Sequence, residues 1–177
     1  IAVVYDELAY TFYNTDNNNV HALGIAGEDF SIRFSNAEKI AEYPFSFNST
    51  FLDNFQSEYE LGEGVINRRI GINQFTGDAY GTIILPDGSS HAALRVKIFR
   101  HSVDTTFVSG TPVSTIETRA TTYEWYTIGS KYPVFGILYF ETNTNGIITT
   151  SKQVGSNTET TTDVDDEPKQ IVSRFEL

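Results

Sequence analysis

Short segments in which apolar and polar residues alternate, each followed by a turn signal, recur along most of this chain. In the segment 30–35, for example, Phe30, Ile32 and Phe34 alternate with polar or charged neighbours. A period of two places successive side chains on opposite faces of a β-strand, so one face of such a strand is apolar and the other is wet. This recurring alternation predicts an all-β protein built from antiparallel strands.

Turn residues separate these segments at intervals of roughly 8–14 residues. Pro86-Asp87-Gly88 is the clearest signal, because proline presets one turn angle and glycine takes the positive φ that closes the loop. Asn145-Gly146 and the run 14–19 are further hairpin signals. About nine to eleven short strands follow from this spacing, which is typical of an antiparallel β-sandwich of the jelly-roll type. Only residues 36–42 have helix-forming composition, and Tyr43-Pro44 would end a helix there within about two turns.

Composition excludes several classes of function. The 177 residues include no cysteine, which rules out a disulfide framework, a thiolate zinc site, an iron–sulfur cluster and a cysteine nucleophile. Acidic side chains outnumber basic ones by 23 to 12, and the net charge of −11 would repel the phosphate backbone of a nucleic acid. No apolar run approaches the roughly 20 residues that a membrane-spanning helix needs. We therefore expect neither nucleic-acid binding nor a membrane span.

The chain divides into two parts by composition. Residues 1–154 carry the strand pattern and are predicted to form one β-sandwich domain. Residues 155–177 are polar and strongly acidic. The acids ahead of Lys169 are Glu159, Asp163, Asp165, Asp166 and Glu167. Such a segment buries too little apolar surface to offset the entropy of ordering it, so on its own it is expected to be a flexible tail. If it is ordered, a neighbouring subunit is expected to order it.

The start of the chain bears on its localisation. The first residue is Ile1, and the sequence contains no methionine. Because a translation product begins with methionine, this start indicates a processed or truncated chain, and it fits removal of a targeting peptide. The absence of cysteine is compatible with an extracellular life. A secreted, extracellular or cell-surface protein is therefore expected.

Metal ligands and cofactor motifs are not recognisable in the sequence. His21, His91 and His101 lack the i, i+2 or i, i+4 spacing of a metal site. The acids at 163–167 lack the glycine turn and alternating ligands of a calcium loop, and they are interpreted as a solvated linker. The oxygen-rich run 16–19 is interpreted as a hairpin turn. Neither a metal nor a cofactor is predicted.

Paired carboxylates are the remaining catalytic possibility, since a glycoside hydrolase uses two acids at a set separation. Glu58 with Glu60 and Glu124 with Glu141 are the candidate pairs, each on a predicted strand. Exposed strand faces carry such acids routinely, and the sequence places neither pair at the required separation. No catalytic residue is assigned, and the chain is predicted not to be an enzyme.

Aromatic residues gather between positions 123 and 132. Exposed aromatic rings on a rigid sheet form stacking platforms for sugars, and they also anchor protein interfaces. Tyr126, Tyr132 and Trp125 are the candidate ligand-binding residues. Trp125 shares its parity with Tyr123, and the alternative is that these two fill the core. Tyr126 lies on the other parity and is the better surface candidate.

Three segments resemble a known group of proteins. Residues 77–97, GDAYGTIILPDGSSHAALRVK, combine a GxGT-like strand, a Pro-x-Gly turn and a Leu-Arg-Val-Lys strand. Residues 43–55, YPFSFNSTFLDNF, and 123–137, YEWYTIGSKYPVFGI, agree with it in order and spacing. Together they resemble secreted β-sandwich proteins of Bacteroidetes-type bacteria that carry a type IX secretion C-terminal sorting signal. The end, PKQIVSRFEL at 168–177, looks like the lead-in to that sorting domain, which is itself absent here.

The resemblance implies export across the outer membrane and removal of the sorting domain near Leu177. Such proteins usually carry further β-structure before the segment that Ile1 begins, so either that part has been removed or the sandwich is short of strands. A sandwich that lacks a strand exposes edge N–H and C=O groups, which are templates for a strand from a neighbouring chain.

These observations lead to a functional hypothesis. The chain is expected to be an extracellular structural protein, a surface filament or appendage subunit that self-associates into a homopolymer. The alternative is a carbohydrate-binding or adhesive module of the cell surface, with a glycan as its partner. A glycoside hydrolase is a remote third alternative.

Overall fold

A computed structural model describes residues 2–5, 9–130 and 132–156 of the chain. The described residues form ten β-strands and include no helix long and apolar enough to cross a membrane. The strands are β1 (Ala2–Tyr5), β2 (Ala9–Thr15), β3 (Asn19–Gly27), β4 (Ser31–Glu42), β5 (Thr50–Gly62), β6 (Val65–Ile84), β7 (Ser90–Val108), β8 (Thr111–Thr127), β9 (Phe135–Thr144) and β10 (Ile147–Ser156). Every paired strand runs antiparallel to its neighbour, which confirms the predicted antiparallel all-β fold.

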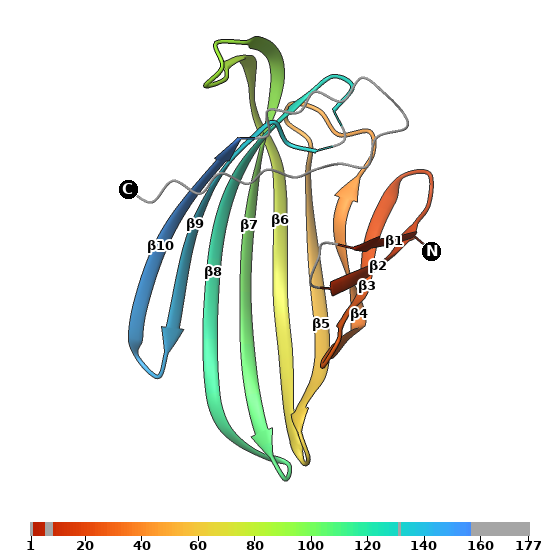
Figure 1. The fold of residues 1–177 in the computed structure, drawn as a ribbon, viewed down its shortest axis with the longest axis vertical. Coiled ribbons are helices and arrows are strands. Elements are labelled where there is room, and N and C mark those ends of the chain that lie inside the picture. The colour runs from red at the N-terminus through yellow and green to blue at the C-terminus, as the bar shows by residue number, and fades with distance from the viewer. Residues whose placement is uncertain (1, 6–8, 131, 157–177) are drawn as a thin grey trace.

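The ten strands lie in one sheet in chain order, from β1 to β10 (Figure 1). A jelly-roll sandwich has instead two sheets joined by Greek-key connections. The sandwich arrangement is therefore not confirmed, although the strand type agrees with the prediction. Of the acidic segment expected at 155–177, the residues from 157 onward lie outside the described part of the chain.

Tight turns form where the sequence predicts them. Pro86-Asp87-Gly88 connects β6 to β7, and Gly88 has a φ of 84° and donates its N–H to the Leu85 carbonyl at 2.9 Å. The Asp87 carboxylate accepts hydrogen bonds from the hydroxyl and the N–H of Ser89, and these bonds lower its pKa. Asn145-Gly146 is a two-residue turn between β9 and β10, with φ values of 52° and 88°. Positive φ at both positions is the type I′ geometry that matches the twist of a hairpin.

The central strands are longer than the sequence pattern indicates. β6, β7 and β8 have 20, 19 and 17 residues. Residues 65–72 and 82–85 each have a strand pattern of their own, with glycines between them, but β6 runs through both as one strand. A glycine weakens a strand unless a neighbour uses the space of its missing side chain. At Gly71 that neighbour is the ring of Phe55, which would lie only 2.2 Å from a Cβ.

The sheet has two faces, and each is named by one residue that it carries. The Phe55 face holds the odd-numbered residues of β5, those of β6 up to Gly77, and the even-numbered residues of β7, β8 and β9. The Trp125 face holds the odd-numbered residues of β7, β8 and β9 and the even-numbered residues of β10.

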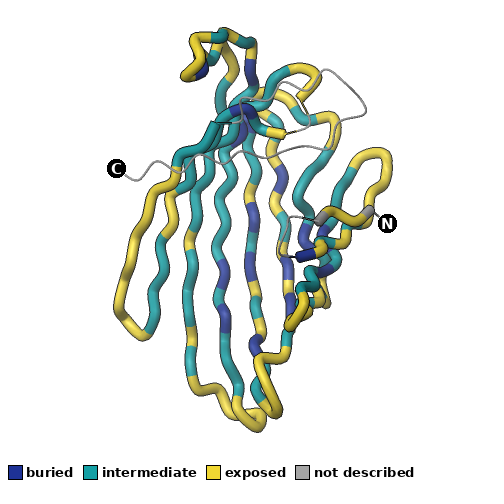
Figure 2. Tube along the Cα trace, in the orientation of Figure 1, coloured by how far each residue is buried: buried dark blue, intermediate teal, exposed yellow. Residues whose placement is uncertain are grey.

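The Phe55 face is the more buried because β4 bends across it. β4 pairs with β5 only between Arg33 and Asn36, and the rest of β4 continues past a bulge. There the Glu38 carboxylate meets the Arg100 guanidinium of β7 at 2.6 Å. Phe55, fully buried, packs beneath β4 against Phe34, with ring centroids 6.2 Å apart. Figure 2 shows the buried positions gathered mainly along β5, β6 and β7.

Candidate functional site

Side chains on the Trp125 face stand in rows that cross β7 to β10. Residues directly opposite each other on neighbouring strands have Cβ atoms about 5 Å apart, so each row is continuous. The four central rows are Arg95, Trp125 and Phe135; Lys97, Tyr123, Ile137 and Val154; Phe99, Thr121, Tyr139 and Lys152; and His101, Arg119, Glu141 and Thr150. No second sheet and no helix of the described residues covers this face.

Aromatic rings form a band down this face, defined by Trp125, Phe135, Tyr123 and Tyr139. Trp125 meets Phe135 edge-on, with centroids 5.3 Å apart, and Tyr123 meets Tyr139 at 6.4 Å and 90°. The Arg95 guanidinium carbon lies 5.2 Å from the Tyr123 ring and 5.7 Å from the Trp125 ring. Edge-to-face contacts and a stacked cation hold the rings in fixed orientations. Tyr139 remains 45% exposed.

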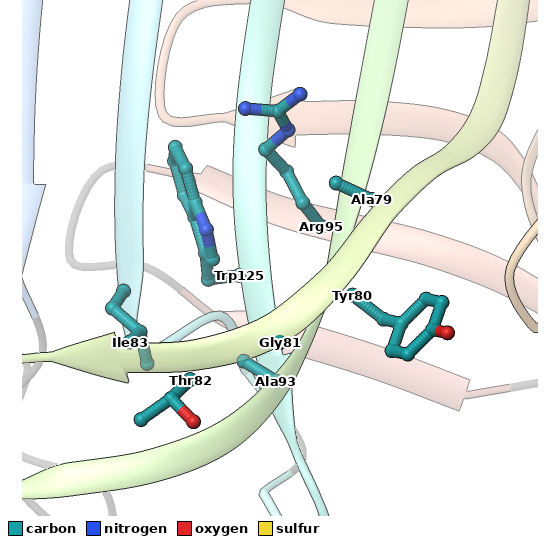
Figure 3. A pocket seen from close by; sticks show the side chains of 8 residues that line it. All are labelled: Ala79, Tyr80, Gly81, Thr82, Ile83, Ala93, Arg95 and Trp125. Atoms are coloured by element: carbon teal, nitrogen blue, oxygen red, sulfur yellow. The ribbon is translucent and has the colours of Figure 1, made fainter.

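A hollow of about 120 Å³ lies at the upper end of the band. Its lining is Ala79, Tyr80, Gly81, Thr82, Ile83, Ala93, Arg95 and Trp125. Figure 3 shows Trp125 and Arg95 side by side against the β6 strand, with the Tyr80 ring directed away from them. The hollow is small because short side chains of β6, rather than an enclosing loop, leave the space beside the indole.

A β-bulge in β6 creates this hollow. The register shifts between Gly77 and Ala79, so beyond the bulge the odd-numbered residues of β6 reach the Trp125 face. Ala79 then lies opposite Arg95. The bulged residue, Asp78, binds the Arg95 guanidinium through two hydrogen bonds of 2.9 and 3.1 Å. This pairing raises the pKa of Arg95 and fixes its side chain beside the aromatic band.

A shallow groove of about 540 Å³ follows the two lower rows. Its lining includes Phe99, Arg119, Thr121, Tyr139, Glu141 and Lys152. Arg119 bridges Glu117 at 2.6 Å and Glu141 at 3.2 Å, and the Nε2 atom of His101 lies 2.8 Å from the Glu117 carboxylate. The groove therefore combines an aromatic wall with a fixed set of hydrogen-bonding and charged groups.

Two lysines flank the band without an ion pair among the described residues. Lys97 stands beside Tyr123 on β7, and Lys152 stands beside Tyr139 on β10. The Lys152 ammonium lies 5.5 Å from the Tyr139 ring centroid. Arg95 of β7 and Arg119 of β8 also lie on this face, and both pair with carboxylates. Within the described part of the chain, the two lysines are therefore the cations of β7 to β10 on this face that form no ion pair.

The Phe55 face carries a different set of charges, which act in packing. Burial lowers the pKa of Arg100, and the neighbouring Glu38 opposes that shift. The Asn73 amide donates to the same Glu38 carboxylate at 2.6 Å, and Arg69 binds Asp104 at 2.9 Å. These groups join β4, β6 and β7, and neither the hollow nor the groove is lined by them.

The structure does not bring the three aromatic candidates from the sequence together. Trp125 lies in the aromatic band, half-buried. Tyr126, the next residue, points to the Phe55 face, where its hydroxyl donates to Glu124 and burial raises its pKa. Tyr132 is 50% exposed in the connection between β8 and β9, where its carbonyl accepts from the Ser130 hydroxyl.

Sequence reasoning missed Tyr139, Lys97 and Lys152. Alternation along each strand assigns Tyr139 and Lys152 to one face of their own strands. No local feature of the sequence shows that β9 places Tyr139 opposite Thr121. Register is fixed by the turn between two strands, and only the Asn145-Gly146 turn was a recognisable signal for it. A two-residue turn at that point is enough to place Tyr139 opposite Lys152, the pairing that β9 and β10 form.

The candidate carboxylate pairs differ in their placement. Glu124 pairs with Gly136 on the Phe55 face, whereas Glu141 pairs with Arg119 on the Trp125 face, so the sheet separates these two acids. Glu58 and Glu60 share one face of β5, and Glu58 binds Arg68 at 2.6 Å.

Two oxygen-rich segments of the sequence, 16–19 and 163–167, bear on metal binding. Within the described residues no group of three His, Asp or Glu side chains converges as metal ligands do. The Asp16 carboxylate accepts the N–H groups of Asn18 and Asn19, both at 2.7 Å, as a turn residue does. The acids at 163–167 lie outside the described residues.

Comparisons with protein families, curated proteins and solved structures find no match for this chain. The resemblance to type IX-secreted proteins, carried by the segments 43–55, 77–97 and 123–137, therefore stays a prediction. The rows, the aromatic band and the sheet edges are the observations on which a function can be based.

Proposed function

We propose that the chain is a non-enzymatic, extracellular structural protein that assembles with copies of itself by extending its sheet from edge to edge. The observation that carries this proposal is the free edge of β10. Among the described residues, β10 pairs on one side only, with β9, along all ten of its residues. An edge of this length presents backbone N–H and C=O groups that another strand can pair with.

The two-residue turn between β9 and β10 determines which backbone N–H groups of β10 point away from β9. In a two-residue turn the flanking residues, Thr144 and Ile147, form a hydrogen-bonded pair. Hydrogen-bonded and non-hydrogen-bonded pairs then alternate along an antiparallel ladder. The backbone N–H groups of Ile148, Thr150 and Lys152 therefore point away from β9. Ile147 and Ile148 are also 71% and 60% exposed, which adds apolar surface at this edge.

The opposite edge of the sheet supplies a partner for β10. β1 pairs only with β2 among the described strands, and its Val3 and Val4 are exposed. In the ladder of ten successive antiparallel strands, β1 and β10 have opposite sense, although β1 lies across the molecule relative to β10 (Figure 1). A second copy placed beside the first therefore continues the antiparallel alternation. Pairing of two different edges is heterologous, and it generates an open polymer when the rotation between copies does not close a ring.

Location outside the cell is the second part of the proposal. It is supported by the resemblance of three segments to secreted proteins and by the lack of cysteine. Fractionation of the native source, with immunodetection of the chain, tests it. Recovery in the cytoplasmic fraction alone would contradict this part and leave the edge-pairing proposal intact.

A proline at the free edge tests the assembly. Ile148→Pro removes an N–H that points away from β9, so the fold of one subunit should remain while pairing with the next strand weakens. We expect the concentration needed for assembly to rise roughly tenfold or more, since a lost hydrogen bond of about 1 kcal/mol is joined by the steric effect of the ring. Light scattering over a concentration series and negative-stain microscopy measure this.

Ile148→Val is the matched control, because it keeps the N–H and a β-branched side chain and should assemble as the parent does. Filaments that Ile148→Pro shortens or abolishes support the proposal. A closed dimer would contradict pairing of β10 with β1 and indicate pairing of β10 with itself. A parent chain that stays monomeric at high concentration would overturn the proposal as a whole.

A further inference from the structure

We propose that the Trp125 face of β7 to β10 binds an acidic polysaccharide, a polymer of sugars that carry carboxylate groups. Tyr123 and Tyr139 would form the stacking platform, and Lys97 and Lys152 would contact the carboxylates. This site is independent of the edge pairing proposed above, because it uses side chains on a face rather than backbone groups at an edge.

The aromatic band has the geometry of a stacking platform. Tyr139 presents 45% of its surface beside a groove of about 540 Å³, and Tyr123 holds it edge-on at 6.4 Å. A sugar ring has an apolar C–H face that packs on an aromatic ring, as other apolar groups do. The platform is also rigid, since it lies on paired strands and is braced by Arg95.

Charge selects an acidic ligand over a neutral one. On the strands β7 to β10, the Trp125 face carries four cationic side chains and two carboxylates, and Asp78 of β6 pairs with one of the cations, Arg95. The net charge of this group is therefore +1, on a protein whose net charge is −11. The carboxylates, Glu117 and Glu141, are both paired with Arg119. The uncommitted cations beside the tyrosines are Lys97 and Lys152, on opposite sides of the platform. Such lysines beside an apolar platform are complementary to a sugar that has both an apolar face and an anionic group.

Hydrogen-bonding groups line the same groove. Thr121, Thr150 and Glu141 all line it, on the strand of Tyr139 or on an adjacent strand. Hydroxyls and a carboxylate pair well with the hydroxyl groups of a sugar, which both donate and accept. A purely apolar docking surface would not place these groups around the ring.

The charge pattern also favours a polysaccharide over a nucleic acid, although both can stack on aromatic rings. A phosphate backbone has closely spaced charges, and its binding draws on many cations at once. Here one carboxylate, Glu141, lies in the lower rows and a second, Glu117, lies in the next row, and the chain as a whole is strongly acidic. A polymer with one carboxylate per sugar meets less repulsion on this surface.

The experiment measures binding of the full chain to polygalacturonate by isothermal titration calorimetry, with neutral dextran as the reference polymer. We expect saturable binding to polygalacturonate, weakening with added salt, and none to dextran. Tyr139→Ala should weaken binding roughly tenfold, as the loss of one stacking ring does. Lys152→Gln should weaken it by a similar factor through the loss of one ionic contact, and Lys152→Arg should keep it.

Tyr132→Ala is the control for the platform, since Tyr132 is exposed but lies off the sheet and outside the groove. It should bind as the parent does, and circular dichroism establishes that each variant is folded. Equal affinity for dextran, absence of binding to polygalacturonate, or unchanged affinity in both Tyr139→Ala and Lys152→Gln would overturn the proposal. Displacement of polygalacturonate by single-stranded oligothymidylate at a lower concentration would assign the face to nucleic acid instead.

The edge-pairing proposal and the polysaccharide-binding proposal can be tested separately. Ile148 lies on the Trp125 face but does not line the groove, so Ile148→Pro should bind polygalacturonate with unchanged affinity per subunit. Lys152→Gln keeps its backbone N–H and should still assemble. Loss of both properties in either variant would show that the face is formed only in the assembly.

Discussion

The ring of Phe55 lies against the backbone of Gly71, in the space where any other residue would carry its Cβ. The same ring has the Arg100 guanidinium 4.5 Å from its centroid and Phe34 beside it, so it has little room to move. One missing side chain therefore allows a large aromatic residue to be completely buried on an otherwise open sheet. This contact joins β5, β6 and β4 at one point.

Gly71→Ala should destabilise the protein by roughly 2 kcal/mol, since overfilling a packed site forces shifts in its neighbours. Urea unfolding followed by the fluorescence of Trp125, the only tryptophan, measures this. Gly62→Ala is the matched control, because a Cβ at Gly62 meets nothing within 4 Å. Equal stability of the two variants would contradict the packing role of Gly71.

Glu124 gives the protein a pH-dependent contribution to its stability. Burial raises its pKa above 4.5, although the hydrogen bond from Tyr126 opposes the rise. The folded state then holds the proton more strongly than the unfolded chain does, so this contribution falls as the pH rises through the interval above 4.5.

Glu124→Gln removes the ionisation and keeps an oxygen that can accept from Tyr126. The variant should be more stable than the parent at pH 7, and the difference should shrink toward pH 4. Urea unfolding at a series of pH values measures the free energy of unfolding of both proteins. A difference that does not change with pH would mean that the charge of Glu124 is not responsible.

Local alternation predicts that Trp125 and Tyr126 face opposite ways, and the structure agrees. It does not predict which of them is available to a ligand, because β8 is half-buried along much of its length on both sides. What covers the Tyr126 side comes from residues far away in the chain. Tyr139, which the sequence did not single out, is the more exposed ring because β9 lies near the edge of the sheet.

At the scale of elements, β4 shows how distant contacts override local preference. Residues 36–42 have helix-forming composition, yet they extend as a strand that crosses the Phe55 face. Glu38 binds Arg100 there, and the N–H of Lys39 donates to Asp53 at 2.8 Å. Helix propensity differs by only a few tenths of a kcal/mol between residues, so these contacts decide the conformation.

Glu38→Ala should destabilise the protein by roughly 2 kcal/mol, because it leaves the half-buried Arg100 charge without its partner. The double variant Glu38→Ala, Arg100→Met should recover part of that loss, since no charge is then left unpaired. Urea unfolding of the two single variants and the double variant measures the coupling. A purely additive result would mean that the ion pair does not hold β4 in place.

Turns and strand lengths differ in how far they follow from the sequence. The Pro86-Asp87-Gly88 and Asn145-Gly146 turns are predictable because each residue has a local reason to be there, a fixed φ, a carboxylate acceptor or a positive φ. The length of β6 is not predictable in the same way. Gly71 and Gly77 look like breaks in the strand pattern, and only the groups that pack on them, Phe55 and the backbone of Ser46, explain why the strand continues.

At the scale of the whole molecule, the antiparallel all-β fold predicted from the sequence is confirmed, whereas the predicted sandwich is not. Alternating strands with one wet face are common to a sandwich and to a single curved sheet. The two differ in their connections, and here each described strand pairs with its sequence neighbours. The described residues form an open sheet in which two edges have no partner strand and one face has no second layer on it. The proposed assembly uses the edges, and the proposed polysaccharide site uses the face.

The chain-order topology also bears on how the protein acquires its structure. Pairing between sequence neighbours requires no distant segment to arrive first, so each hairpin can close from its own turn and extend along the strands. Contacts near the Asp87-Gly88 turn form between residues close in sequence, and Val65 meets Val108 only at the far end of the same ladder. Local contacts are the ones that form fastest, because little loop entropy is lost in making them. A chain delivered one end first can thus build its sheet strand by strand, in the order in which the strands appear.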